Sequence, residues 1–469
     1  VENDRLLLLR NTVEGERPAG FVSYREIGND ELFGVLKDME LANLVRGKSS
    51  REILLITGIY AREENAGDSE VIRDAPQQLL VEVLAKELEK NYSFALFVAE
   101  RGTTTKEVVY VLERQGFIRP HMADENDKRT IYMVDMHEPL MFLHNLETTI
   151  KEPFASNPAV LDAIEKNHRK LQMAMTKLYP GNLVISLSSG VMHHRLVDRI
   201  TALNDVPREP LVPRRLGKNM CVPFGKILRG KVVPNTVTKT LHTDKVYEPD
   251  LNSFTIEPFP YYSPLKSQIE TIKSFDRPVI LVDDLVHKAD RLQVLVPQLR
   301  EDGIPIRKVV VGVLSGYGRD LMQCLKVPVE SIYSMPNLRQ WFVESTLYPF
   351  IGGDTVRREE MKVAGLQPSI NMILPYATPR LSGCSREALV EFSACCIENS
   401  RDLFQVLEAE YRKMYAKNLT LSRLSEAVIL PLCPDKGSCM EYDENLAASV
   451  YLENDLETLW RMKEFLIKG

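Results

Sequence analysis

The segment RPVILVDDLVHKADRL, residues 277–292, constrains the fold of this chain more than any other. Val279 to Asp283 predict a buried strand, because a continuous apolar run is typical of a strand covered on both faces of a parallel sheet. Asp283 and Asp284 stand where this strand ends, and a helix is expected from about Ala289. Ligands of open parallel sheets bind beyond the carboxyl ends of the strands, which places the pair at a ligand edge. The alternative is that the two carboxylates only cap the helix.

The chain has 469 residues, a length that predicts about three domains. Strands and helices alternate over residues 1–140 and 141–365, whereas residues 366–469 are mostly amphipathic helix, expected to be a scaffold or an interface. We therefore predict an α/β protein: a mixed-sheet domain, then a parallel-sheet domain, then a helical C-terminal region.

Two adjacent carboxylates at a sheet edge suit two kinds of partner. They accept hydrogen bonds from vicinal hydroxyls, or they hold a hydrated Mg²⁺ through oxygen ligands. The helix that begins next has an N-terminus that favours a phosphate. Asp283 and Asp284 are thus candidate Mg²⁺ ligands, through water.

This segment resembles the phosphoribosyl-pyrophosphate motif of type I phosphoribosyltransferases, which consists of an apolar strand, two acidic residues, two apolar residues and a short loop. The resemblance covers residues 183–335. It implies that Asp283 and Asp284 are catalytic and contact ribose hydroxyls, and that the ligand is phosphoribosyl pyrophosphate or a nucleotide-like molecule, bound with Mg²⁺. It also gives the pyrophosphate position to Ser188, Ser189 and Gly190 of LVISLSSG, and a mobile active-site loop to residues 217–250.

The phosphate loop departs from the family pattern, because it consists of His287, Lys288, Ala289, Asp290 and Arg291. Ala replaces the expected Gly, so a left-handed backbone there costs about 1 kcal/mol. Asp290 adds a negative charge, whereas Lys288 and Arg291 add two positive ones. Three outcomes stay open: the loop holds phosphate with its side chains, it has drifted to another ligand, or it is inactive.

A basic stretch from Pro207 to Lys245 supports an anion site. It contains nine Lys and Arg residues against Glu209 and Asp244, nine minus two or +7 in a chain of net charge −6. Candidate ligand-binding residues within it are Lys226, Arg229 and Lys231. Few aromatic residues accompany these charges, so we expect a small anion and no nucleic acid. A solvated basic loop without a ligand is the alternative. His193 and His194 are candidates for acid–base work or for helix-start packing.

The order of elements in residues 1–140, ending in LERQGF, resembles a GNAT acetyltransferase. The family's Gly-rich phosphate loop is here the acidic REENAGDSEVIRDAP, with Glu63, Glu64, Asp68 and Glu70, which repels a pyrophosphate. Its frequent catalytic Tyr is replaced by Leu112, and Tyr110 is expected on another side of the helix. We therefore predict a GNAT-like shape without acetyl-CoA binding.

Three functions remain open: a phosphoribosyltransferase, a non-catalytic nucleotide-sensing or scaffolding module of a larger multidomain enzyme, and an acetyltransferase.

No apolar run of about 18 residues is present, which predicts no membrane span. The start VENDRLLLLRNT lacks signal-peptide features, and its first residue, Val, indicates a processed chain or part of a longer one. Seven scattered cysteines, among them Cys433 and Cys439, fit reduced thiols and a cytoplasmic protein. Further domains and a homo-oligomer are the possible protein partners.

Overall fold

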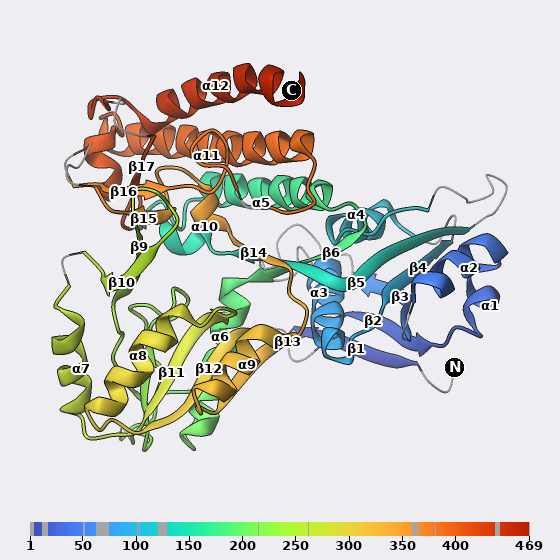
Figure 1. The fold of residues 1–469 in the computed structure, drawn as a ribbon, viewed down its shortest axis with the longest axis horizontal. Coiled ribbons are helices and arrows are strands. Elements are labelled where there is room, and N and C mark those ends of the chain that lie inside the picture. Colours follow the sequence, from blue (N-terminus) through green and yellow to red (C-terminus); the bar gives the residue numbers. More distant parts are fainter. Residues whose placement is uncertain are drawn as a thin grey trace. The chain divides into compact units, whose positions relative to one another are not determined.

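The structure is a computed structural model (Figure 1), and it describes residues 4–11, 17–49, 52–61, 75–100, 102, 104–120, 129–213, 215–260, 262–358, 363, 365–379, 381–436 and 441–468. The chain forms two compact units. The first consists of residues 1–142, 175–186 and 334–341, and the second of residues 143–174, 187–333 and 342–469. No part of the structure tests the three-domain division at 140 and 365, which stays a prediction.

The first unit is built on a mixed sheet with the strand order β1-β2-β3-β4-β5-β14, in which β6 also pairs with β5. From β1 to β5 neighbouring strands are antiparallel except β3 and β4, which pair in parallel over Leu54–Ile56 and Ala95–Phe97. The strands are β1 (Arg5–Asn11), β2 (Arg17–Ile27), β3 (Ile53–Ala61), β4 (Phe94–Glu100), β5 (Arg129–His144), β6 (Asn182–Ser188) and β14 (Gln340–Val343).

Helices cover this sheet because their apolar faces match it. Leu32, Leu41 and Val45 of the two short helices α1 and α2 pack in one core with Ile53 and Leu96 of the sheet. The helices of the unit are α1 (Leu32–Leu36), α2 (Met39–Lys48), α3 (Ala75–Glu87), followed by the 3-10 turn Leu88–Lys90, and α4 (Lys106–Arg114).

Helix α4 is capped at both ends. Thr105 accepts a hydrogen bond from the Val108 N–H at 3.3 Å, and the chain leaves the helix through Gly116 at φ 90°. Leu112 is buried and Tyr110 is exposed, so the two face different sides of the helix, as predicted. The acidic loop with Glu63, Glu64, Asp68 and Glu70 lies outside the described residues.

The second unit contains the predicted sheet around Asp283, with the strand order β13-β12-β11-β7-β8. The pairs β12–β11, β11–β7 and β7–β8 are parallel. The strands are β7 (Met220–Pro223), β8 (Val237–Thr238), β11 (Val279–Val286), β12 (Ile306–Ser315) and β13 (Val329–Met335), and the helices are α6 (Ser189–Leu203), α7 (Leu265–Lys273), α8 (Asp290–Glu301) and α9 (Gly316–Cys324). The apolar run that predicted a buried strand is thus confirmed.

Two predictions about this sheet are wrong. Strand β6, which ends in Ser188, pairs with β5 in the sheet of the first unit and not beside β11. Its apolar run is equally suited to either sheet, because burial on both faces does not select a neighbour. Residues 217–250 are not a single loop, since they contain β7, β8 and part of a further sheet, and their apolar side chains at Met220, Phe224 and Leu228 are buried.

That further sheet also belongs to the second unit and has the order β10-β9-β15-β16-β17. It mixes antiparallel pairs, β10–β9 and β15–β16, with parallel ones, β9–β15 and β16–β17. Its strands are β9 (Thr243–Tyr247), β10 (Phe254–Pro258), β15 (Asp354–Val356), β16 (Gln367–Ile370) and β17 (Leu432–Pro434). The C-terminal region therefore contributes strands as well as the predicted helices.

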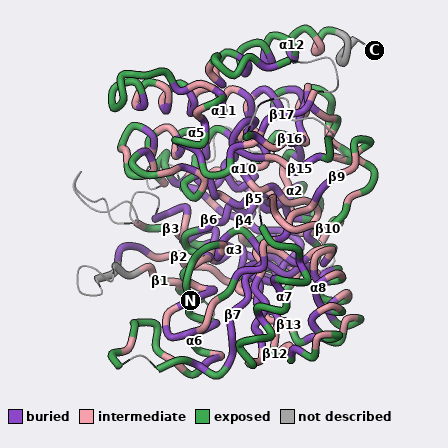
Figure 2. The backbone as a smooth tube through the Cα atoms, turned by 90° about the vertical axis from the view of Figure 1, so that its left-hand side faces the viewer, coloured by how far each residue is buried: buried purple, intermediate pink, exposed green. Residues whose placement is uncertain are grey.

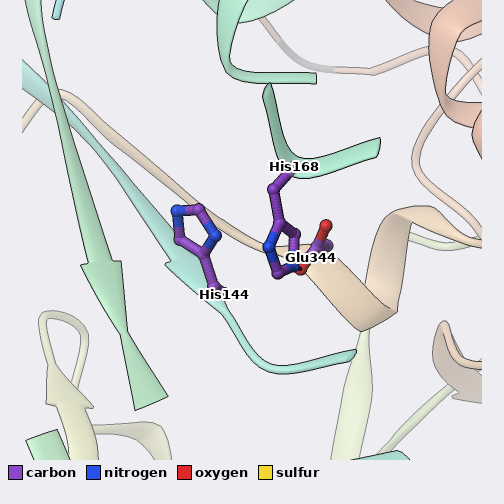
Figure 3. A group of neighbouring side chains, drawn as sticks. All are labelled: His144, His168 and Glu344. Atoms are coloured by element: carbon purple, nitrogen blue, oxygen red, sulfur yellow. Dashed lines mark ion pairs between the residues drawn. The ribbon is translucent and has the colours of Figure 1, made fainter. Parts of the chain in front are cut away.

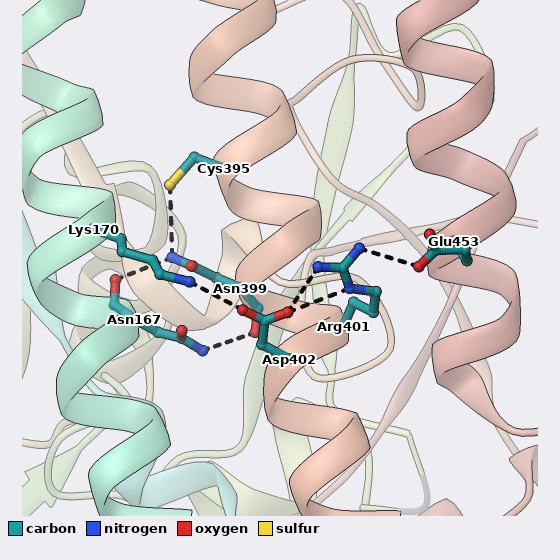
Figure 4. A network of polar contacts seen from close by, with 7 residues as sticks. All are labelled: Asn167, Lys170, Cys395, Asn399, Arg401, Asp402 and Glu453. Atoms are coloured by element: carbon teal, nitrogen blue, oxygen red, sulfur yellow. Dashed lines mark hydrogen bonds and ion pairs between the residues drawn. The ribbon is translucent and has the colours of Figure 1, made fainter.

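The remaining helices of the second unit are long, except for α10: α5 (Pro158–Leu178), α10 (Glu344–Leu347), α11 (Arg386–Tyr415) and α12 (Ala448–Lys468), with 3-10 turns at Leu146–Thr149 and Leu421–Glu426. Asn167 of α5 and Asn399 of α11 exchange hydrogen bonds, each amide donating to the other residue's backbone carbonyl, at 2.8 and 3.0 Å (Figure 4). In Figure 2 the strands are mainly buried, whereas α11 and α12 each expose one side. Such helices have one apolar stripe, as their amphipathic sequences predict.

Six of the seven cysteines are described, and all six are free thiols, while Cys439 lies outside the described residues. Among the helices that the structure describes, none is both long and apolar enough to cross a membrane.

Candidate ligand site at the carboxyl end of β11

The loop that follows β7 wraps around the Asp pair. Strand β7 lies directly beside β11, and its loop, residues 224–230, returns its backbone to Asp284. The N–H groups of Lys226 and Ile227 donate to the two carboxylate oxygens of Asp284 at 2.7 and 2.9 Å. Both hydrogen bonds are charge-assisted, so Asp284 holds this loop in place.

Gly225 is required for this close approach. A Cβ atom at this position would lie 2.6 Å from a carboxylate oxygen of Asp283 and 2.6 Å from one of Asp284. Only glycine leaves room for the loop to pass over the two aspartates. The close approach of the loop to Asp283 and Asp284 therefore depends on glycine at position 225.

Asp283 is in a different environment from its neighbour. One of its oxygens accepts the Asp284 N–H at 2.8 Å, and the Arg291 guanidinium lies 4.0 Å away. Burial raises the pKa of Asp283 to about 7, an effect that Arg291 opposes and the charge of Asp284 reinforces. A carboxyl group with this pKa both accepts and donates protons near neutral pH.

Two guanidinium groups act electrostatically on the pair, those of Arg291 and Arg229. Arg291 also donates to the Phe224 carbonyl at 3.4 Å. Burial lowers the pKa of Arg229, and the charge of Arg291 lowers it further, so the two guanidinium groups interact. Enclosure by protein likewise lowers the pKa of Lys226, although part of its side chain reaches solvent, and Asp354 opposes that shift.

Arg229 has buried N–H donors that are not used in hydrogen bonds to the described residues. Its Nε and Nη2 atoms are buried and have no hydrogen-bond partner among the described residues. Its guanidinium lies 5.1 Å from the centre of the Phe259 ring. Unpaired buried donors cost free energy, so an acceptor placed at this guanidinium would be stabilising.

Aromatic side chains next to Arg229 add an apolar wall. The rings of His242 and Tyr262 stack at 3.8 Å, and the Phe259 ring lies 6.2 Å from that of Tyr262. Tyr262 is half exposed, which leaves part of this wall open to solvent. Stacked rings beside a guanidinium are suited to a planar, anionic ligand.

The start of α8 differs from a bare phosphate loop. Ala289 adopts φ 53°, the left-handed conformation that the sequence predicted to be costly at a non-glycine residue. Asp290 occupies the first turn of the helix, where a phosphate would otherwise bind, and pairs with Lys245 at 3.1 Å. The negative charge at the N-terminus of α8 is therefore the Asp290 carboxylate, and its counter-ion is Lys245.

Other predicted residues are placed elsewhere. Ser188 caps α6 by accepting the Val191 N–H, Ser189 is buried, and Gly190 is exposed on the same helix. None of the three belongs to the loop beside β11, because that position is taken by residues 224–230. The Nδ1 atom of His287 lies 2.8 Å from the Ser315 hydroxyl, which itself caps α9. Lys288 is exposed.

His193 and His194 are neighbours on α6 with ring centres 5.6 Å apart, and Lys231, just after the 224–230 loop, acts on His193. Burial lowers the pKa of His193 to about 4, and the charge of Lys231 contributes to the shift. His193 is therefore neutral at pH 7. Burial also lowers the pKa of Lys231. Arg214, another residue of the basic stretch, lies outside the described residues.

Sequence reasoning missed the acidic residues of the second sheet. Asp244 of β9 accepts a hydrogen bond from the Thr355 hydroxyl, and it opposes the lowering of the pKa of Lys226 and Arg229. Burial raises the pKa of Asp354 of β15, which the charges of Lys226 and Lys245 counteract. A signal existed in the segment GGDTV, where a carboxylate opens a short strand, but nothing in the sequence links it to Asp283.

The Asp pair does not suit a directly bound Mg²⁺. Both oxygens of Asp284 already accept backbone N–H groups, and Arg291 lies beside Asp283. Direct Mg²⁺ sites use unshared carboxylate oxygens in octahedral geometry, so only contact through water is compatible with these residues.

We expect Asp283→Asn to remove a pH dependence of stability. An acid with a raised pKa in the folded state keeps its proton to a higher pH than in the unfolded state. Its contribution to stability is therefore lost as pH rises from about 4 to about 7, by at most about 1.4 kcal/mol per pH unit. Urea unfolding at pH 5 and pH 8 should show a smaller decline in the variant than in the parent protein. The exposed Asp320→Asn is the control, and an equal decline in all three proteins contradicts the assignment.

Comparisons with known proteins give weak likenesses to several solved structures, among them two enzymes. One is FeeM, an N-acyl amino acid synthase from uncultured soil microbes, with 19% identity, a TM-score of 0.21, and coverage of 29% of this chain and 73% of that chain. The other is a purine phosphoribosyltransferase from Pyrococcus horikoshii, with 12% identity, a TM-score of 0.21, and coverage of 33% of this chain and 87% of that chain. No family model and no curated protein matches the sequence. Scores this low establish no family and no activity.

Proposed function

We propose that this protein binds a phosphoribosyl or nucleotide-like anion at the carboxyl end of β11, and that transfer of a 5-phosphoribosyl group is the reaction such a site would serve. The observation that carries the proposal is the buried guanidinium of Arg229, whose Nε and Nη2 lack partners among the described residues, next to Arg291 and the Asp pair. A phosphate supplies the missing acceptors through charge-assisted hydrogen bonds.

Each part of the ligand has a counterpart in the site. Asp283 is suited to a ribose hydroxyl, because its carboxyl group can accept or donate a hydrogen bond near pH 7. The rings of His242, Phe259 and Tyr262 offer a stacking surface for a base. In this proposal Mg²⁺ enters with the phosphates of the ligand and reaches the aspartates through water.

A non-catalytic binding role is the second candidate, and the start of α8 favours it. Asp290, paired with Lys245, occupies the helix N-terminus that would otherwise bind the sugar phosphate, and Ala289 holds a strained backbone there. This role predicts ligand binding without release of pyrophosphate when phosphoribosyl pyrophosphate and Mg²⁺ are supplied with candidate acceptor bases. Pyrophosphate release that is lost in Asp283→Asn would instead identify a transferase.

Calorimetric titration tests the binding proposal. The ligands are phosphoribosyl pyrophosphate, nucleoside mono- and triphosphates, and acetyl-CoA, each with and without Mg²⁺. We expect at least one phosphoribosyl or nucleotide ligand to bind and Arg229→Met to weaken it about 10- to 100-fold, because one or two hydrogen bonds between charged groups are lost. Arg307→Met, an exposed change near the start of β12, is the matched control. Absence of binding, or equal affinity in Arg229→Met, contradicts the proposal.

A further inference from the structure

A second cluster of reactive side chains is built from three other elements of the second unit. His144 is the last residue of β5, His168 lies on α5, and Glu344 is the first residue of α10. One nitrogen or oxygen atom from each lies within 4.8 Å of the other two. Figure 3 shows the two imidazole rings and the carboxylate gathered at one point.

Two members of this cluster, His168 and Glu344, form a close ion pair. His168 Nε2 and Glu344 Oε2 are 2.6 Å apart, yet neither atom has a well-aligned hydrogen-bond partner in the described part of the chain. Glu344 is fully buried and His168 is 9% exposed. Taking both groups out of water costs free energy that their ion pair offsets only in part, and a divalent cation between them would accept a lone pair from each.

Neighbouring groups hold the carboxylate in position. The Asn145 side chain donates to the Ser345 hydroxyl at 2.9 Å, and its oxygen accepts the Ser345 N–H at 2.9 Å, which fixes the start of α10. The Tyr348 hydroxyl donates to Glu344 Oε1 at 3.4 Å, on the oxygen that does not face His168. Such partners orient the ligands of metal sites.

A further oxygen is within reach of the same point. Glu147 Oε1 lies 3.8 Å from His168 Nε2, and the Glu147 side chain is 45% exposed. Two neutral imidazoles and two carboxylates balance the charge of one divalent cation. The exposed Glu147 also gives the cluster a route to solvent.

We propose that His144, His168 and Glu344 bind a divalent transition-metal ion, with Zn²⁺ as the best match and Glu147 or water as the fourth ligand. Imidazole nitrogen combined with carboxylate oxygen selects such ions over Mg²⁺. Tetrahedral bonds of about 2.0–2.2 Å place neighbouring ligand atoms about 3.3–3.6 Å apart, so the pair at 2.6 Å opens by about 0.7–1 Å on binding. The proposal is independent of the ligand site at β11.

Metal content and cobalt spectroscopy test this site. The full chain is stripped with a chelator, loaded with Zn²⁺ or Co²⁺, desalted and analysed. We expect about one metal ion per chain, visible d–d bands from tetrahedral Co²⁺, and a melting temperature that rises with Zn²⁺ concentration.

His144→Gln is the decisive variant, because His144 is half-buried and its replacement does not leave a charge unpaired in the core. We expect Zn²⁺ binding at least about tenfold weaker and loss of the cobalt bands, with a melting temperature in chelator close to that of the parent. His194→Gln, a change of an exposed histidine on α6, should retain the metal. A parent protein that retains no Zn²⁺ or Co²⁺, or a His144→Gln variant that binds as the parent does, overturns the proposal.

Discussion

Asp284→Ala is expected to lower the free energy of unfolding by about 2–4 kcal/mol, since two charge-assisted hydrogen bonds to backbone N–H groups are lost. The donors are Lys226 and Ile227, in the loop that Asp284 holds against β11. Urea unfolding monitored by circular dichroism gives the measurement. Part of the loss is returned, because the change also removes the negative charge beside Asp283.

Asp284→Asn is the informative companion. Its amide keeps one oxygen acceptor but turns an NH₂ group toward the second backbone donor, so we expect a loss between that of the alanine variant and zero. If the free energies of unfolding of Asp284→Ala and the parent protein differ by less than about 0.5 kcal/mol, Asp284 does not hold the loop in place, and the carboxylate pair serves only the ligand.

Gly116→Ala is expected to destabilise the first unit by about 2–5 kcal/mol, by two additive causes. At φ 90° an alanine is strained, and its Cβ would lie 2.1 Å from the backbone carbonyl oxygen of Asn182. Left-handed backbone costs about 1–2 kcal/mol, and forced overpacking typically adds about 1–3 kcal/mol. Thermal unfolding of the parent and the variant measures the difference.

Gly47→Ala is the matched control for that experiment. Gly47 lies in α2, and a Cβ atom there would meet nothing within 4 Å. Alanine is the better helix former, so this change should stabilise the protein by about 0.5–1 kcal/mol. The account of Gly116 fails if both variants shift the melting temperature in the same direction.

Local signals in the sequence predicted the elements that depend on local chemistry. The apolar run before Asp283 predicted β11, helical spacing predicted that Tyr110 and Leu112 face different sides of α4, and Ala289 in a glycine position predicted the strained φ of 53°. In each case the relevant physics, burial of a strand or the conformational preference of one residue, is contained in a few neighbouring residues.

Features that depend on pairing between distant segments were not predictable. The run ending in Ser188 fits either sheet, and its pairing with β5 is decided by tertiary contacts. Asp284 was expected to face a ligand, but its acceptors serve N–H groups that lie far away in the sequence. His144, His168 and Glu344 show no motif spacing, because three separate elements bring them together.

The central claim is that an anionic ligand binds at the carboxyl end of β11, and hydrogen–deuterium exchange tests its location. The protein is compared with and without a saturating ligand from the calorimetric panel, in the presence of Mg²⁺. We predict that backbone amides of residues 224–230 and 283–291 exchange more slowly with ligand, and that Arg229→Met abolishes this protection at the same ligand concentration. Protection that appears only in the first unit, for example in β4 and α4, or protection at 224–230 that persists in Arg229→Met, would contradict the claim.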